Sequence, residues 1–164
     1  MLKYHWVMDM EIERKFLVND KIEQIDLSKY EKEEITQYYL FKNPEMRIRK
    51  CGEKFYVTYK GAGDLQRIEQ ETDVSPVFFE KFKDYCKGQV IYKTRYKIPL
   101  ANSLVAEVDF YHSYLKGLRI VEIEFDSVEQ ANAFKDFPDF FGEEVTNNPK
   151  YKNKNLSRLK RKPR

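Results

Sequence analysis

The sequence predicts an α+β protein built on an eight-stranded antiparallel β-barrel with a charged lumen and helices packed outside. Three observations support this prediction. Most strand-like segments alternate charged with apolar residues, so each has two different faces. The charged faces carry same-sign doublets, which a solvent-exposed sheet avoids because like charges repel. Short polar turns join neighbouring segments, as in an antiparallel meander. We expect all 164 residues to form one domain.

In the first half of the chain, alternation with a period of two predicts five strands. The first begins at Met10, where Glu11, Glu13 and Lys15 stand on one face and Phe16 on the other. Turns containing Asn, Pro and Gly separate the second, third and fourth strands. The region between residues 19 and 32 is expected to form a short helix or an ordered loop. The five strands are placed at 10–16, 34–41, 46–50, 54–60 and 65–74.

In the second half, two helices have clear start signals. Ser75 followed by Pro76 predicts a helix that continues with an apolar stripe towards Gly88. Ser127 predicts the start of a second helix that reaches Phe137. Alternating segments predict three further strands, at 89–100, 103–111 and 118–125, and a last helical or turn segment is expected around 148–160.

Composition excludes several classes of protein. There are 30 Lys and Arg against 27 Asp and Glu, so the chain is not a polycation that grips nucleic acid by bulk charge. Its basic excess is local, and we expect residues 157–164 to form a basic tail. Two cysteines and no apolar leader indicate a cytoplasmic protein. No apolar run is long enough to span a membrane. Residues 1–9 show no period and are expected to be an extension.

Closing the sheet with its charged faces inward gives a lumen wide enough for one small ligand. The alternative is an ordinary sheet with one solvated face. The pattern of any one strand, taken alone, favours this alternative. Same-sign doublets on several strands disfavour it, because they need counter-ions. The lumen would hold the bases Lys15, Arg47, Arg49, Lys60, Arg67, Lys93 and Arg95, and the acids Glu11, Glu13, Glu69, Glu71, Glu107, Asp109, Glu122 and Glu124.

These residue types indicate phosphate chemistry with a hard metal ion. Carboxylates without His or Cys partners favour Mg²⁺ or Mn²⁺. His5 and His112 do not have the spacing of a zinc site. Guanidinium groups bind phosphate oxygens in pairs, and lysines act as point charges. The predicted ligand is therefore a metal-chelated phosphate chain, and the predicted reaction is phosphoryl transfer. No glycine-rich phosphate-binding loop is present.

A series of spaced motifs resembles a known family. In chain order they are Glu11-Ile12-Glu13-Arg14-Lys15, Gln37-x-Tyr39-Leu40, Arg47-Ile48-Arg49, Thr58-Tyr59-Lys60, Arg67-x-Glu69-x-Glu71, Lys93-Thr94-Arg95, Glu107-x-Asp109, Glu122-Ile123-Glu124, Glu144-Val145-Thr146 and Tyr151-x-Asn153. Over residues 10–157 this series resembles the CYTH superfamily, the triphosphate tunnel metalloenzymes. The resemblance implies a β-tunnel open at both ends, with acids on one side holding metal and bases on the other holding triphosphate.

The resemblance also implies residue roles. Lys15 and Tyr39 are the catalytic candidates, with Tyr39 as a proton acceptor; its alternative role is a tyrosine of the barrel wall, because an unperturbed phenol is a weak base near neutral pH. Asn148 stands where many members carry an acid. The implied metal ligands are Glu11, Glu13, Glu69, Glu71, Asp109, Glu122 and Glu124, and the implied triphosphate contacts are Lys15, Arg47, Arg49, Lys60, Lys93, Arg95 and Lys150.

The leading functional hypothesis is hydrolysis of the terminal phosphoryl group of inorganic triphosphate or a related compound, with Mg²⁺ or Mn²⁺. The alternative enzymes are a class IV adenylate cyclase and a thiamine triphosphatase. A hypothesis of another class is a non-catalytic polyphosphate or nucleotide sensor. Nucleic-acid binding through the basic tail is disfavoured by the low net charge, no membrane partner is expected, and a homodimer is left open.

Overall fold

The computed structural model describes residues 9–163. The expected extension at 1–9 lies outside this range except for Asp9, which begins the first strand. The strands of the described chain are β1 (Asp9–Val18), β2 (Glu31–Lys42), β3 (Glu45–Cys51), β4 (Lys54–Lys60), β5 (Gln66–Asp73), β6 (Ile91–Pro99), β7 (Val105–Tyr111), β8 (Arg119–Glu124) and β9 (Phe141–Glu144). The α-helices are α1 (Pro76–Lys83), α2 (Val128–Ala133) and α3 (Asn153–Leu156). Two 3₁₀ turns, Asp20–Gln24 and Leu27–Lys29, occupy the region for which the sequence predicts a short helix or an ordered loop.

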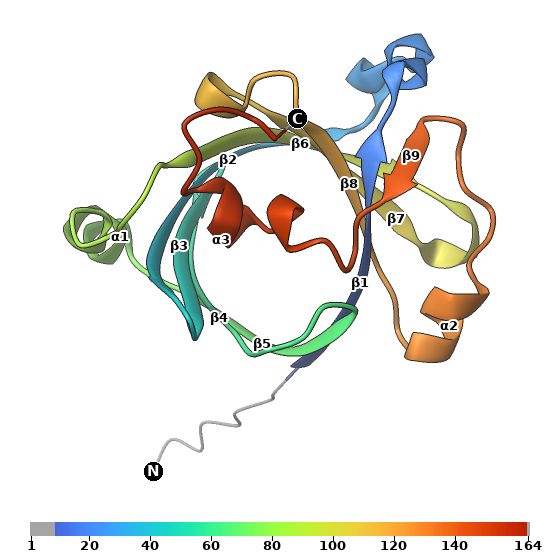
Figure 1. The fold of residues 1–164 in the computed structure, drawn as a ribbon. Helices are drawn as coiled ribbons and strands as arrows, with labels where there is room; N and C mark the ends of the chain where they lie inside the picture. Colours follow the sequence, from blue (N-terminus) through green and yellow to red (C-terminus); the bar gives the residue numbers. More distant parts are fainter. Residues whose placement is uncertain (1–8, 164) are drawn as a thin grey trace.

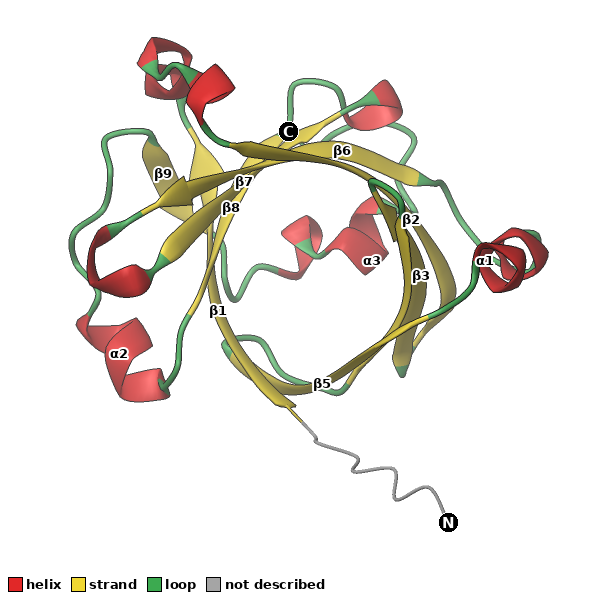
Figure 2. Cartoon of the chain, turned by 180° about the vertical axis from the view of Figure 1, so that it is seen from behind, coloured by secondary structure: helices red, strands yellow, loops and turns green. Residues whose placement is uncertain are grey.

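Eight of these strands close into the predicted antiparallel barrel. The strand order is β5-β4-β3-β2-β6-β7-β8-β1, and pairing of β5 with β1 completes the ring, as Figures 1 and 2 show. The ninth strand, β9, was not predicted, and it pairs with the end of β1 beside the barrel. Its four residues are too short and too polar to show alternation.

The pairing register places charged residues of neighbouring strands side by side on the inner face of the barrel. Lys15 stands opposite Glu122, and Arg95 stands opposite Asp109. Because side chains alternate along a strand, the intervening residues point outward. Loops and helices cover part of this outer face, whereas Met10, Tyr59 and Ile68 stay exposed. On the outer face, α1 packs its buried Phe79 against ring neighbours on β2 and β4. Ala131 of α2 is buried in a second outer cluster over β1 and β8.

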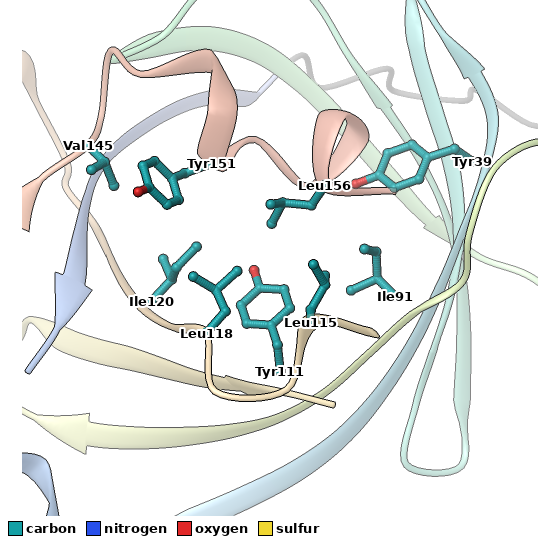
Figure 3. Packing of buried hydrophobic residues seen from close by; sticks show 9 residues of the cluster. All are labelled: Tyr39, Ile91, Tyr111, Leu115, Leu118, Ile120, Val145, Tyr151 and Leu156. Atoms are coloured by element: carbon teal, nitrogen blue, oxygen red, sulfur yellow. The ribbon is translucent and has the colours of Figure 1, made fainter. Parts of the chain in front are cut away.

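The C-terminal segment closes one end of the barrel from inside. At this end the inward-facing strand positions carry apolar and aromatic residues instead of charges, and they pack around Tyr151 and Leu156 (Figure 3). The hydroxyl of Tyr111 donates a 2.7 Å hydrogen bond to the side chain of Asn153. The barrel is therefore not open at both ends as the resemblance implied. Within the predicted segment at 148–160, residues 149–151 form a 3₁₀ turn and residues 153–156 form α3, but so few apolar residues do not reveal which surface will bury them.

The helix starts were predicted well and the helix ends were not. Ser75 and Ser127 each accept a backbone hydrogen bond as N-caps. The first helix ends at Lys83 instead of near Gly88. The second ends at Ala133 instead of near Phe137, and the backbone carbonyls of Ala131 and Phe134 at this end accept hydrogen bonds from the side chain of Arg14. Within residues 9–163, no helix has the length and apolar character needed to cross a membrane.

Candidate active site

The charged lumen is a cavity of about 310 Å³ that gathers side chains from most of the barrel strands and from the C-terminal segment. All seven predicted bases line it, and so do seven of the eight predicted acids; Asp109 lies just behind the lining, paired with lining bases. The charged lining comprises the bases Lys15, Arg47, Arg49, Lys60, Arg67, Lys93, Arg95 and Lys152, and the acids Asp9, Glu11, Glu13, Glu45, Asp64, Glu69, Glu71, Glu107, Glu122 and Glu124.

Sequence reasoning missed several of these residues. Glu45 is buried and precedes Arg47 by two positions on the same strand face, so the alternation rule contained the signal. Lys152 reaches the cavity only because the C-terminal segment crosses the barrel end, which no local pattern predicts. Lys150, which was predicted instead, does not line the cavity, and its ammonium lies 5.7 Å from the ring centre of Tyr151.

On one side of the cavity, carboxylates of β1 and β5 pair with basic residues of β4 and β5. Glu11 of β1 accepts hydrogen bonds from Lys60 at 2.5 Å and from Nε of Arg67 at 2.7 Å. Lys60 also pairs with Glu69 at 2.7 Å. These side chains are largely buried, so water screens their attraction weakly. The predicted metal ligands Glu11 and Glu69 are therefore held by lumen cations in this structure.

The opposite side is organised around one arginine. The guanidinium of Arg95 donates to both oxygens of Asp109 at 2.7 Å and to Glu122 at 2.7 Å, and it also binds Glu107. Lys93 binds the same Asp109 carboxylate. Arg95 and Asp109 are 7% and 0% exposed. A buried pair of this kind is costly to break from one side, because the remaining charge would be left without a partner.

The two inward lysines of this side differ in proton affinity. Burial alone would lower the pKa of Lys15, but Glu122 at 2.8 Å and Glu13 at 3.5 Å outweigh burial and raise it. The pKa of Lys93 is lowered, because burial and the charge of Arg95 outweigh its acidic partner. Lys15 is therefore a permanent cation at neutral pH, suited to hold an anion and unsuited to accept a proton.

Two arginines on β3 retain unused donors. Within the described chain, Nε of Arg47 and Nε of Arg49 are buried and have no hydrogen-bond partner. The nearest carboxylate pairing with Arg47 is a 3.8 Å contact to Glu69, whereas Arg49 binds Glu71 through its Nη2 at 2.8 Å. Buried donors without an acceptor are costly. An oxyanion between these two arginines would satisfy both.

Glu124 marks the acid-rich part of the cavity. Burial and then the carboxylates of Glu11, Glu69 and Glu107 raise its pKa to about 7. A raised carboxylate pKa indicates a position where positive charge is lacking. Among residues 9–163, however, no set of three or more His, Cys, Asp or Glu side chains is already gathered to hold an ion. The acids share one cavity, and binding a metal would require them to exchange lumen bases for it.

Tyr39 lies apart from the charged lining. It is 1% exposed within the apolar cluster that closes the barrel end, and its hydroxyl accepts a 2.5 Å hydrogen bond from Gln37. Burial, followed by the charge of Glu45, raises its pKa despite the nearby Arg47. A phenol with a raised pKa is a poor proton acceptor, so the position fits the wall role better than the catalytic one.

The fold and the sequence are similar to those of known proteins. A CYTH domain model matches residues 9–146. The inorganic triphosphatase of Nitrosomonas europaea is 36% identical over 90% of this chain and 96% of its own, and that of Acetivibrio thermocellus is 34% identical over 91% and 94%. The crystal structure of the inorganic triphosphatase NE1496 is 33% identical, covers 92% of this chain and 95% of its own, and superposes with a TM-score of 0.65. On these grounds the chain belongs to the CYTH domain family.

Proposed function

We propose that this protein is an inorganic triphosphatase that cleaves the terminal phosphoryl group of triphosphate with the help of a divalent metal ion. The observation that carries the proposal is a cavity of about 310 Å³, closed at one end, whose wall is lined by ten acids and eight bases. Its relatives named inorganic triphosphatase match over nearly their whole length, which supports the same substrate.

Charge balance explains why a metal belongs in the reaction. Ten lining acids against eight lining bases give a formal charge of −2, which repels a polyanion. The acid-rich part of the wall, where the pKa of Glu124 is raised, is suited to a hard cation with oxygen ligands. A bound divalent ion would neutralise charge on the transferring phosphoryl group. We assign Mg²⁺ or Mn²⁺ to the predicted acids that line the cavity, Glu11, Glu13, Glu69, Glu71, Glu122 and Glu124. The seventh predicted ligand, Asp109, lies behind the lining and would stay paired with Arg95 and Lys93.

The basic residues divide into two kinds of triphosphate contact. Arg47 and Arg49 offer buried Nε donors that await acceptors, so they would hold the phosphate chain from β3. Lys15, Lys60 and the remaining lumen bases would supply charge once their carboxylate partners turn to the metal. We add Lys152 to this set, because it lines the cavity where Lys150 does not. Position and charge, rather than covalent chemistry, would perform most of the catalysis.

The test is product analysis with purified protein. Triphosphate, ATP and thiamine triphosphate are each incubated with Mg²⁺ or Mn²⁺, and the products are separated by ion-exchange chromatography. The proposal predicts orthophosphate and pyrophosphate from triphosphate, much faster than products from the other two. Cyclic AMP with pyrophosphate from ATP would identify a cyclase instead, and metal-dependent binding of triphosphate without turnover would identify a sensor.

A matched pair of variants locates the reaction in the cavity. Arg47→Leu removes a lining guanidinium, and we expect it to lower kcat/KM for triphosphate by about 100-fold or more. Arg119→Leu removes a guanidinium that pairs with Glu23 on the outer surface, and activity should stay within about twofold of the parent. Equal effects of the two changes would contradict a reaction inside the barrel.

A further inference from the structure

A network of hydrogen bonds outside the cavity joins β1, the strand that carries Lys15, to the C-terminal segment. Arg14 lies on β1 between Glu13 and Lys15 and points away from the lumen. Its guanidinium binds both oxygens of Glu144, at 2.9 Å through Nε and 2.6 Å through Nη2. Its Nη1 donates to the backbone carbonyls of Ala131 and Phe134, at 2.9 and 3.1 Å. One side chain thus connects β1, the end of α2 and the end of β9.

The hydrogen-bond network continues from Glu144 through Thr146 to the cavity wall. The hydroxyl of Thr146 donates to Glu144 at 2.7 Å and accepts the backbone N–H of Lys15 at 3.0 Å. The backbone carbonyl of Lys15 accepts the N–H of Val145 at 2.8 Å. Both backbone polar groups of Lys15 are therefore bound by residues 145 and 146. Thr146 is buried and its side chain lines the cavity.

The chain enters the barrel immediately after this anchor. Residues 147–156 carry Lys152 and Asn153 to the cavity lining and place Leu156, 0% exposed, in the apolar closure. A shift at residue 146 would therefore move the lining groups that follow it, together with the backbone of Lys15. A misplacement of about 1 Å in a site that works by positioning is costly to catalysis.

We propose that Arg14, Glu144 and Thr146 are positioning residues that fix Lys15 of β1 and Lys152 of the C-terminal segment relative to each other in the cavity wall. This inference rests on the proposed function, because the relative placement of these two lysines serves the triphosphate. None of the three residues is assigned a contact with the reacting atoms. Glu144 is the central member, since its two oxygens accept hydrogen bonds from both Arg14 and Thr146.

The experiment compares Thr146→Val, which has similar volume but no hydroxyl, with Thr146→Ser, which keeps it. Glu144→Gln is the second test variant, and Glu143→Gln, an exposed neighbour on the same strand, is its control. Two quantities are measured: steady-state kinetics with triphosphate, and amide hydrogen exchange of a peptide covering 147–156. We expect Thr146→Val and Glu144→Gln to lower kcat/KM by about 10-fold and to speed exchange in that peptide by about fivefold or more. Thr146→Ser and Glu143→Gln should stay within about twofold of the parent in both.

The exchange measurement separates this inference from the proposed function. If the parent protein does not hydrolyse triphosphate, the proposed function fails, while the exchange of 147–156 still reports whether the network anchors the segment. Unchanged exchange in both Thr146→Val and Glu144→Gln would overturn the inference, whatever their activity. Faster exchange with unchanged kcat/KM would also overturn it, because the anchor would then have no role in catalysis. The serine variant guards against a general loss of folding, since it should rescue both readouts.

Discussion

The carboxyl group of Glu124 lowers the free energy of unfolding near neutral pH. Burial and neighbouring carboxylates raise its pKa from 4.5 to about 7, so between these pH values the folded protein binds a proton that the unfolded chain has released. Its contribution to stability therefore falls as the pH rises from about 4.5 to about 7, and stays low above that. A carboxylate that opposes folding in this way is consistent with the cation-binding role that we propose for it.

Replacing Glu124 with Gln should therefore stabilise the metal-free protein. The difference in free energy of unfolding between variant and parent, measured by urea titration in EDTA, should grow in favour of the variant as the pH rises from about 5 to about 7. The same variant should lose metal-dependent turnover. A difference that grows as the pH falls would contradict the assigned environment of this carboxylate.

Tyr39→Phe separates the two roles considered for this tyrosine. If the residue belongs to the wall, as its burial and raised pKa indicate, kcat for triphosphate should stay within about threefold of the parent, whereas loss of a general base costs about 100-fold or more. The change should lower stability by about 1 kcal/mol, because the buried amide of Gln37 loses its acceptor. A 100-fold fall in kcat with unchanged stability would restore the catalytic role.

At the scale of elements, strands were easier to predict than their surroundings. The period of two placed Glu11, Glu13 and Lys15 on one face, and the structure has all three in the cavity. Helix starts followed from Ser75 and Ser127, because an N-cap is a local interaction. Helix ends, β9 and the closure of one barrel end depend on contacts between residues far apart in sequence, such as Arg14 with Glu144, and no local pattern contains them.

Closure of the barrel end by the C-terminal segment depends on few large side chains. Leu156 is fully buried against inward-facing residues of several strands. Leu156→Ala should destabilise the protein by about 2–5 kcal/mol, through lost burial and a residual cavity. The measurement is the urea midpoint, with Val77→Ala on the exposed face of α1 as the control expected to change it little. An equal effect of the two substitutions would contradict the packing described.

In the molecule as a whole, the acids and bases that line the barrel lumen largely neutralise one another. Among the described residues most lumen acids and bases pair with one another, with Nε of Arg47, Nε of Arg49 and the carboxyl group of Glu124 as exceptions, so a metal or a polyanion alone must displace existing ion pairs. A metal-chelated triphosphate offers both charges together and can exchange every pair at once, the carboxylates turning to the metal and the cations to phosphate oxygens. Metal and triphosphate should therefore bind cooperatively.

The magnitude of this cooperativity is measurable with a triphosphate analogue whose bridging oxygens are replaced by imido groups, which resists hydrolysis. We expect Mg²⁺ to tighten its binding by at least about 10-fold in calorimetry, after correction for the complex formed in solution, and the analogue to tighten Mg²⁺ binding by the same factor. Glu122→Gln frees Lys15 and Arg95 from a carboxylate, so the variant should bind the analogue more tightly than the parent without metal and show weaker coupling. Equal affinity for the analogue in EDTA and in Mg²⁺ would mean that the lumen bases already suffice for the anion, and the paired wall would then have no part in metal dependence.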